Sequence, residues 1–316
     1  MRRAVLRIAT AGLVLCGLTG AAKTDGGQKK PAKNAAAGSR VAVPCGGGVR
    51  LTLSSGEVAQ GSLIVVALTA KAPIESAKAE WDGREMPLWL AGKSGEDWAG
   101  LLGVDLEKAP GKYEARISGK VQNGGDFLCE ATVEVRSGRF PTENLKVEKQ
   151  FVEPDPEQLA RAKEETQKLR GIFATVTAER LWNGPFRVPL DGVTTGGNFG
   201  RRRVLNGEPG SPHTGVDFPA STGTLVHAAQ AGRVVLAEPL FFAGNTVVVD
   251  HGLGVYTFYG HLSVFSVHVG DEVKAGTELG KVGATGRVTG PHLHWGVTVD
   301  RERINGLGIV NLSGIS

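Results

Sequence analysis

Residues 232–259, GRVVLAEPLFFAGNTVVVDHGLGVYTFY, decide the fold of the C-terminal part of the chain. The stretch holds three apolar, alternating runs separated by turns that contain glycine, at 232–236, 245–249 and 255–259. Alternating runs with short turns between them predict strands joined as antiparallel hairpins. The same pattern of apolar runs and closely spaced glycines continues through residues 192–316. We therefore expect this region to be one domain built on an antiparallel β-sheet.

All seven histidines of the chain lie in this region, between His213 and His294. His292-Leu-His294 places two imidazoles two residues apart. In a strand such residues face the same side about 6.6 Å apart, so both rings can enter one pocket. His213-Thr-Gly-Val-Asp217 adds an imidazole and a carboxylate, but an extended step of four residues spans about 13 Å. A bend is therefore required, and Gly215 permits one.

Two imidazoles and one carboxylate make a three-ligand site, in which a catalytic zinc ion keeps its fourth position for water. Only three of the four residues in these two motifs need to bind, so the fourth is free to act on the proton of that water or on the substrate. The sequence has no H-E-x-x-H motif to supply a glutamate base, so a histidine must take that role. His261 is the best second candidate. A non-haem iron site also uses two histidines and a carboxylate, but its usual His-x-Asp spacing is missing.

Three motifs of this domain resemble, in order, the signature motifs of the lysostaphin-type, or LytM, zinc metalloendopeptidases. They are His213-x-x-x-Asp217, Tyr259-x-His261-Leu262 and Gly290-Pro291-His292-Leu293-His294. The resemblance implies one Zn²⁺ ion per chain, held by His213, Asp217 and His294. It also implies that His261 and His292 polarise the attacking water and stabilise the tetrahedral intermediate.

The resemblance covers residues 199–299, with the glycine pattern between the motifs included. It implies an enzyme that hydrolyses stem and cross-link peptides of bacterial peptidoglycan. Envelope members of the family cleave links between stems, including D-Ala to diaminoacid bonds, whereas others cut glycine bridges, so the bond cut here stays open. Some members have lost the ligands and only activate amidases. A catalytically silent module that binds cell wall or activates an amidase is therefore the alternative, although this chain keeps all five residues.

The first 22 residues have the three parts of a secretory signal peptide. Basic residues are followed by an apolar segment from Ile8 to Leu18 and then by small residues. The apolar segment is shorter than the roughly 20 residues of a membrane-spanning helix. Lipid anchoring at Cys16 is not favoured, because Leu15 stands where lipoprotein signals usually carry a small residue. We expect an exported protein of the periplasm or cell envelope, with a flexible polar spacer at residues 23–40.

Residues 41–136 predict a separate β-sandwich domain. Short β-rich runs alternate there with glycine and proline turn signals. The region also looks like the β-sandwich that precedes the catalytic domain in certain envelope members of the family. Cys45 and Cys129 lie near its two ends and are the cysteines that remain once the leader is removed. An even pair in an exported protein is expected to form a disulfide, here between the first and last strands.

Residues 137–191 predict a linker with one helix. Asp155 can cap this helix, Pro156 suits its first turn, and apolar residues recur at steps of three and four from residue 159 to residue 176. Gly171 disfavours one unbroken helix, since an interior glycine costs about 1 kcal/mol relative to alanine.

Charge and composition exclude several functions. The chain has 36 Lys and Arg against 32 Asp and Glu, a net charge of +4, and no basic run of the kind that nucleic-acid binding needs. No glycine-rich phosphate-binding motif is present, so nucleotide binding has no support. We expect a monomer. Partners among envelope regulators are open, as is whether the sandwich inhibits or targets the enzyme.

Overall fold

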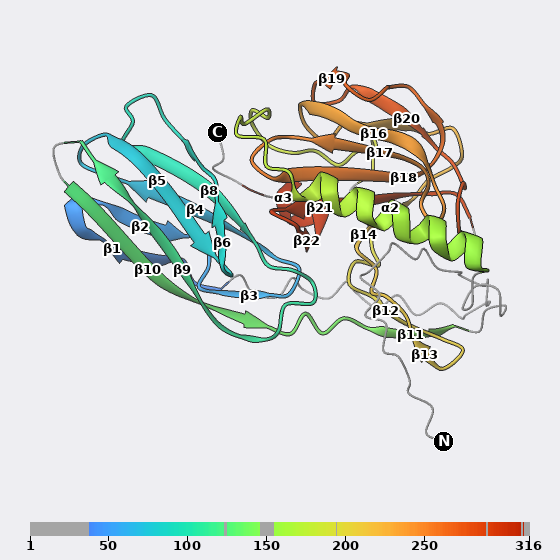
Figure 1. Cartoon of the computed structure of the whole chain (residues 1–316), viewed down its shortest axis with the longest axis horizontal. Helices are drawn as coiled ribbons and strands as arrows, with labels where there is room; N and C mark the ends of the chain where they lie inside the picture. The colour runs from blue at the N-terminus through green and yellow to red at the C-terminus, as the bar shows by residue number, and fades with distance from the viewer. Residues whose placement is uncertain are drawn as a thin grey trace.

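The computed structural model describes residues 38–122, 125–145, 155–193, 195–288, 290–310 and 312. These residues are mainly β, as the sequence predicts, and form two β-rich bodies side by side (Figure 1). The predicted signal peptide, Cys16 and most of the predicted spacer lie outside the described residues. No helix in the described part of the chain combines the length and the apolar character needed to cross a membrane.

The N-terminal body is a β-sandwich of two five-stranded sheets. One sheet has the order β1 (Val41–Pro44), β2 (Arg50–Leu53), β4 (Leu63–Thr69), β8 (Asp97–Gly103), β7 (Leu88–Leu90). The other has the order β3 (Glu57–Ala59), β10 (Gly125–Arg136), β9 (Gly111–Val121), β5 (Ile74–Trp81), β6 (Arg84–Met86). Burial alternates along β4 and β10, so each sheet turns one set of apolar side chains into a shared core.

A disulfide joins the two sheets of this sandwich. Cys45 directly follows β1, Cys129 lies within β10, and their Cα atoms are 5.1 Å apart. The bond connects residues separated by 84 positions. In the chain-entropy model a loop of this length stabilises the fold by about 4 kcal/mol, because it restricts the unfolded chain.

In the mature protein we expect no free thiol, because both remaining cysteines are consumed by this bond. Thiol labelling of the unfolded, unreduced protein checks this. Two reactive thiols per chain would contradict the disulfide, whereas one would indicate retention of Cys16 or partial oxidation. Replacing both cysteines by serine should lower the free energy of unfolding by about 4 kcal/mol.

The linker contains helix α2 (Pro156–Ala174), which lies across the C-terminal body in Figure 1. Asp155 caps it as predicted, since its carboxylate accepts a hydrogen bond from the Gln158 N–H at 2.8 Å. Gly171 disfavours one unbroken helix, yet the helix runs without a break through this residue. Leu169, Ile172 and Phe173 pack against a core cluster of the C-terminal sheet. This packing outweighs the propensity cost of glycine, which is about 1 kcal/mol.

The C-terminal body is built on a nine-stranded sheet whose strands pair antiparallel throughout. Its main order is β14 (Gly215–Pro219), β21 (His292–Val299), β18 (Val255–Phe265), β17 (Gly244–Asp250), β16 (Gly232–Leu240), β19 (Glu272–Val273). The strands β15 (Leu225–His227), β20 (Glu278–Val282) and β22 (Glu302–Ile304) pair beside this path, and helix α3 (Gly306–Val310) follows. The hairpins predicted from residues 232–259 are β16–β17 and β17–β18.

A small three-stranded sheet connects the linker to this body. It consists of β11 (Thr142–Leu145), β12 (Arg202–Leu205) and β13 (Glu208–Pro209). β11 pairs parallel with β12, so the chain just after the sandwich lies beside the chain that leads into β14. This pairing brings the linker close to the residues described below.

The two bodies share a packed interface. Ala99 and Leu101 of β8 and Trp89 of β7 belong to the core of the C-terminal body, and Trp89 meets Trp182 at 5.5 Å between ring centroids. Arg303 adds hydrogen bonds of 2.9 and 2.7 Å to the two carboxylate oxygens of Asp105. Strand β8 is therefore buried on both faces. The domain boundaries at 136–137 and 191–192 stay predictions.

Candidate metal site

Strand pairing brings the histidine motifs together. In the register of β14 and β21, Asp217 lies opposite His294 and Pro219 opposite His292. On the other side of β21, Gly260 of β18 lies opposite His294, which places His261 next to the same position. His213 lies two residues before β14. Residues far apart in the sequence thus meet on three adjacent segments.

Three atoms converge at the centre of this group. His213 Nε2 lies 3.0 Å from His294 Nδ1, and these two nitrogens lie 3.1 and 3.0 Å from Asp217 Oδ1. Both N–H groups can donate to the carboxylate, but the two nitrogens then face each other without a hydrogen bond. A cation between the three atoms would satisfy all of them. Zinc bonds of about 2.0–2.1 Å in a tetrahedral site separate the ligand atoms by about 3.3 Å, close to the observed distances.

The ionisation of this cluster suits metal binding. Burial alone would raise the pKa of Asp217, but hydrogen bonds and charge from His213 and His294 hold that pKa well below its usual range. Burial lowers the pKa of His294 to about 4, although Asp217 opposes the shift. At neutral pH the aspartate is therefore ionised and His294 is neutral, which are the forms that bind metals.

Gly215 makes room for the His294 ring, whereas the sequence predicts that it permits a bend. It is already part of β14, and a Cβ atom there would lie 2.6 Å from His294 Nε2. Glycine at this position leaves room for the His294 ring, so any larger residue would displace that ring from the cluster.

His261 is held in an unusual backbone conformation beside the cluster. Its φ of 63° lies in the left-handed region, at a register shift between β17 and β18. Its backbone N–H donates to Ala243 O at 2.8 Å, and its ring Nδ1–H donates to Thr285 O at 2.9 Å. The carbonyl can only accept, so Nδ1 carries the proton. His261 Nε2 is buried and has no hydrogen-bond partner among the described residues.

The rings of His261 and His292 are in contact, with centroids 4.9 Å apart and ring planes tilted by 49°. His292 Nδ1 lies 2.9 Å from Gly290 O, and His292 Nε2 lies 3.7 Å from Asp217 Oδ1. Burial, with added repulsion from His294 and His292, lowers the pKa of His261 to about 3. His261 is therefore a neutral ring at neutral pH, with an electron pair on Nε2.

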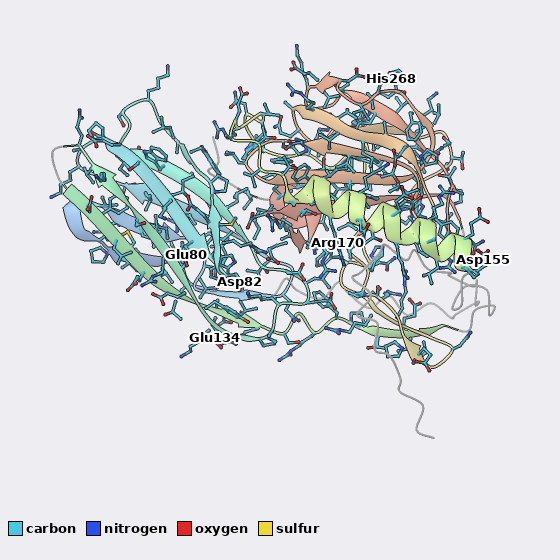
Figure 2. All side chains as sticks on the ribbon, in the orientation of Figure 1. Glu80, Asp82, Glu134, Asp155, Arg170 and His268 are labelled. Atoms are coloured by element: carbon cyan, nitrogen blue, oxygen red, sulfur yellow. A yellow bond between two sulfur atoms is a disulfide. The ribbon has the colours of Figure 1, made fainter. Side chains whose placement is uncertain are left out.

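The remaining histidines make contacts elsewhere. His227 bonds Gly276 O through Nδ1, and His251 bonds Ala231 O and the Thr257 hydroxyl. His268 lies at the outer edge of the C-terminal body, with its side chain 94% exposed (Figure 2). The five predicted site residues are therefore together, and these three are not among them.

Sequence reasoning missed Asn198, whose side-chain amide donates to Asp217 Oδ2 at 3.1 Å. Asn198 directly precedes the first residue of the family resemblance, and its neighbourhood carries no ligand pattern. The contact depends on a long-range pairing of Gly197 with Asp217, which no local signal encodes.

The part of the chain that carries this cluster is similar to known peptidases. Residues 211–306 match the model of Peptidase family M23. Peptidoglycan DD-endopeptidase ShyA of Vibrio cholerae is 42% identical over 97 residues, which are 31% of this chain and 23% of that protein. Peptidoglycan DD-endopeptidase ShyB of the same organism is 35% identical over 133 residues, 41% of this chain and 30% of that protein. The chain thus spans less than a third of either relative.

A solved structure extends the similarity beyond the matched domain. The crystal structure of a Pseudomonas aeruginosa protein assigned to peptidase M23 superposes with a TM-score of 0.54 at 27% identity. The superposition covers 78% of this chain and 92% of the Pseudomonas aeruginosa chain. Together with the family match, this finding confirms the resemblance inferred from the three motifs.

Proposed function

We propose that this protein, whose residues 211–306 form a domain of peptidase family M23, is a zinc-dependent endopeptidase that hydrolyses peptide cross-links of bacterial peptidoglycan. The observation that carries the proposal is the convergence of His213, Asp217 and His294 beside two further histidines. The substrate class is supported by the two relatives named peptidoglycan DD-endopeptidase.

The donor set fits zinc. Two imidazole nitrogens and one carboxylate oxygen are ligands that zinc accepts, and three protein ligands leave a fourth position for water. We assign the ligand atoms as His213 Nε2, Asp217 Oδ1 and His294 Nδ1, because these are the atoms that converge. When bound, zinc lowers the pKa of a water molecule to about 7 and polarises the scissile carbonyl.

The two remaining histidines would handle protons and charge. His261 has its proton on Nδ1, so Nε2 is the atom that can accept a hydrogen bond from the attacking water and polarise it. Its position is fixed by backbone and side-chain hydrogen bonds, so little reorganisation is needed. His292 is the more exposed of the two rings, so we assign it to the charge that develops on the substrate carbonyl.

The silent alternative has less support. A module that only binds cell wall or activates an amidase has no need for the ligand set, yet all five residues of the resemblance are present and adjacent. An exported enzyme of the cell envelope accounts for the predicted signal peptide and the disulfide together.

Removing the metal should abolish activity reversibly. We expect the purified protein to contain about one zinc ion per chain, as the three-ligand site implies. A chelator should stop the release of soluble fragments from purified sacculi, and added zinc should restore it. Metal analysis and fragment release, measured on the same samples, check this. Bound zinc without fragment release would favour the silent module, and bound iron without zinc would favour oxygenase chemistry.

A further inference from the structure

We propose that Asn198 is a positioning residue of the metal site, which fixes the orientation of Asp217 and is itself supported by the N-terminal sandwich. The inference rests on the zinc function proposed above. It concerns residues outside 211–306, the range that matches the family model.

The two oxygens of Asp217 have different surroundings. Oδ1 faces His213 and His294, whereas Oδ2 accepts a hydrogen bond of 3.1 Å from the Asn198 amide. The terminal torsion of an aspartate side chain is soft, so without a partner on Oδ2 the carboxylate can rotate. The amide therefore selects the rotation that directs Oδ1 at the two imidazoles.

The main chain around Asn198 is tied to two of the proposed ligands. Gly197 and Asp217 exchange hydrogen bonds of 3.1 and 2.9 Å between their backbone groups. Gly200 N–H donates to His213 O at 2.8 Å, and His213 N–H donates to Arg201 O at 3.0 Å. We call residues 197–201 the clamp. It fixes the backbone of His213 and Asp217 relative to each other.

The backbone conformation of Asn198 restricts what can replace it. Its φ is 72°, in the left-handed region that glycine and asparagine adopt more readily than other residues. Its carbonyl accepts a hydrogen bond from Arg201 N–H at 3.0 Å, which closes the turn of the clamp. Glycine adopts this backbone conformation but has no side-chain amide. A glycine variant therefore removes the hydrogen bond to Asp217 and keeps the backbone conformation.

The sandwich packs against the other side of the clamp. Gly61 lies in the turn between β3 and β4 with a φ of 78°, and a Cβ atom there would lie 2.3 Å from the ring of Phe199. Phe199 also meets Phe140 of the linker at 5.9 Å between ring centroids. The Phe199 ring, which directly follows Asn198 in the chain, thus contacts both the sandwich and the linker. The N-terminal domain therefore supports the metal site through this contact.

The test compares zinc dissociation constants by chelator competition in the full mature chain. For Asn198→Gly we expect an increase of about 10–100-fold, the usual effect of removing a partner of a metal ligand. The melting temperature of the metal-free variant should stay at the wild-type value, because glycine tolerates the backbone conformation. The matched control is Asn206→Gly, another asparagine with a left-handed φ, 52°, which is exposed in the β12–β13 turn. It should keep the wild-type constant.

A second variant tests the support from the sandwich. Phe199→Ala keeps the amide but removes the ring that packs on Gly61, so we expect its zinc dissociation constant to rise as well. Asn198→Gly with wild-type zinc affinity would overturn the role of the amide, and Phe199→Ala with wild-type affinity would overturn the role of the sandwich. If the wild-type chain itself fails to bind zinc, the proposed function fails instead.

Discussion

Replacing His294 by alanine is expected to abolish both zinc binding and peptidoglycan hydrolysis. His294 Nδ1 is one of the three converging atoms, so its removal leaves two protein ligands where a catalytic zinc usually has three. The substitution also removes one of the two imidazoles that stabilise the ionised carboxylate of Asp217. Zinc content by metal analysis and fragment release from sacculi, measured on the purified variant, check the prediction. His213→Ala should give the same double loss for the same reason.

The matched control for these variants is His268→Ala. His268 is 94% exposed and lies at the outer edge of the domain, so its removal should change neither zinc content nor rate (Figure 2). A His294→Ala protein that kept both its metal and its rate would disprove the ligand assignment.

Replacing His261 by alanine should separate metal binding from chemistry. The ring lies outside the three converging atoms, so we expect zinc content to stay near that of the wild type. Turnover should fall by roughly 10²–10⁴, the range for losing a positioned acid–base group. His292→Ala should behave in the same way, although it lies two residues from a proposed ligand. Zinc content and the rate at saturating substrate are the two measurements.

A second variant at His261 is needed because its backbone has a left-handed conformation. Alanine is poorly suited to a φ of 63°, whereas asparagine tolerates this region, so His261→Asn removes the imidazole with less strain. Both variants should lose turnover to a similar extent. Loss of zinc from His261→Asn would show that His261 is a ligand, and the role assignment would then be wrong.

Local patterns predicted much of the fold. Alternation with glycine turns in residues 232–259 predicted the hairpins of β16, β17 and β18, because such strands pair with their neighbours in sequence. The pairing of β14 with β21 joins residues that are far apart in the sequence, and periodicity alone does not specify it. The helix stays unbroken at Gly171 because tertiary packing outweighs the low helix propensity of glycine.

In the site, too, local spacing could be predicted from the sequence and contacts between distant segments could not. The two-residue spacing of His292 and His294 predicted that their rings share one side of a strand, and both approach the ring of His261. The left-handed conformation of His261 could not be predicted, because it lies at a register shift between β17 and β18 that no local pattern specifies. The role of Asn198 could not be predicted, because its hydrogen bond to Asp217 forms only when two separate segments of the chain pair.

The most direct test of the proposed activity is the digestion of defined, peptide-cross-linked muropeptide dimers, followed by mass analysis of the products. We predict that the zinc-loaded protein converts the dimers into monomers by adding one water across the cross-link. The His294→Ala protein should leave them intact. Intact dimers after treatment with correctly folded, zinc-loaded wild-type protein would contradict the proposal that this chain is a peptidoglycan endopeptidase.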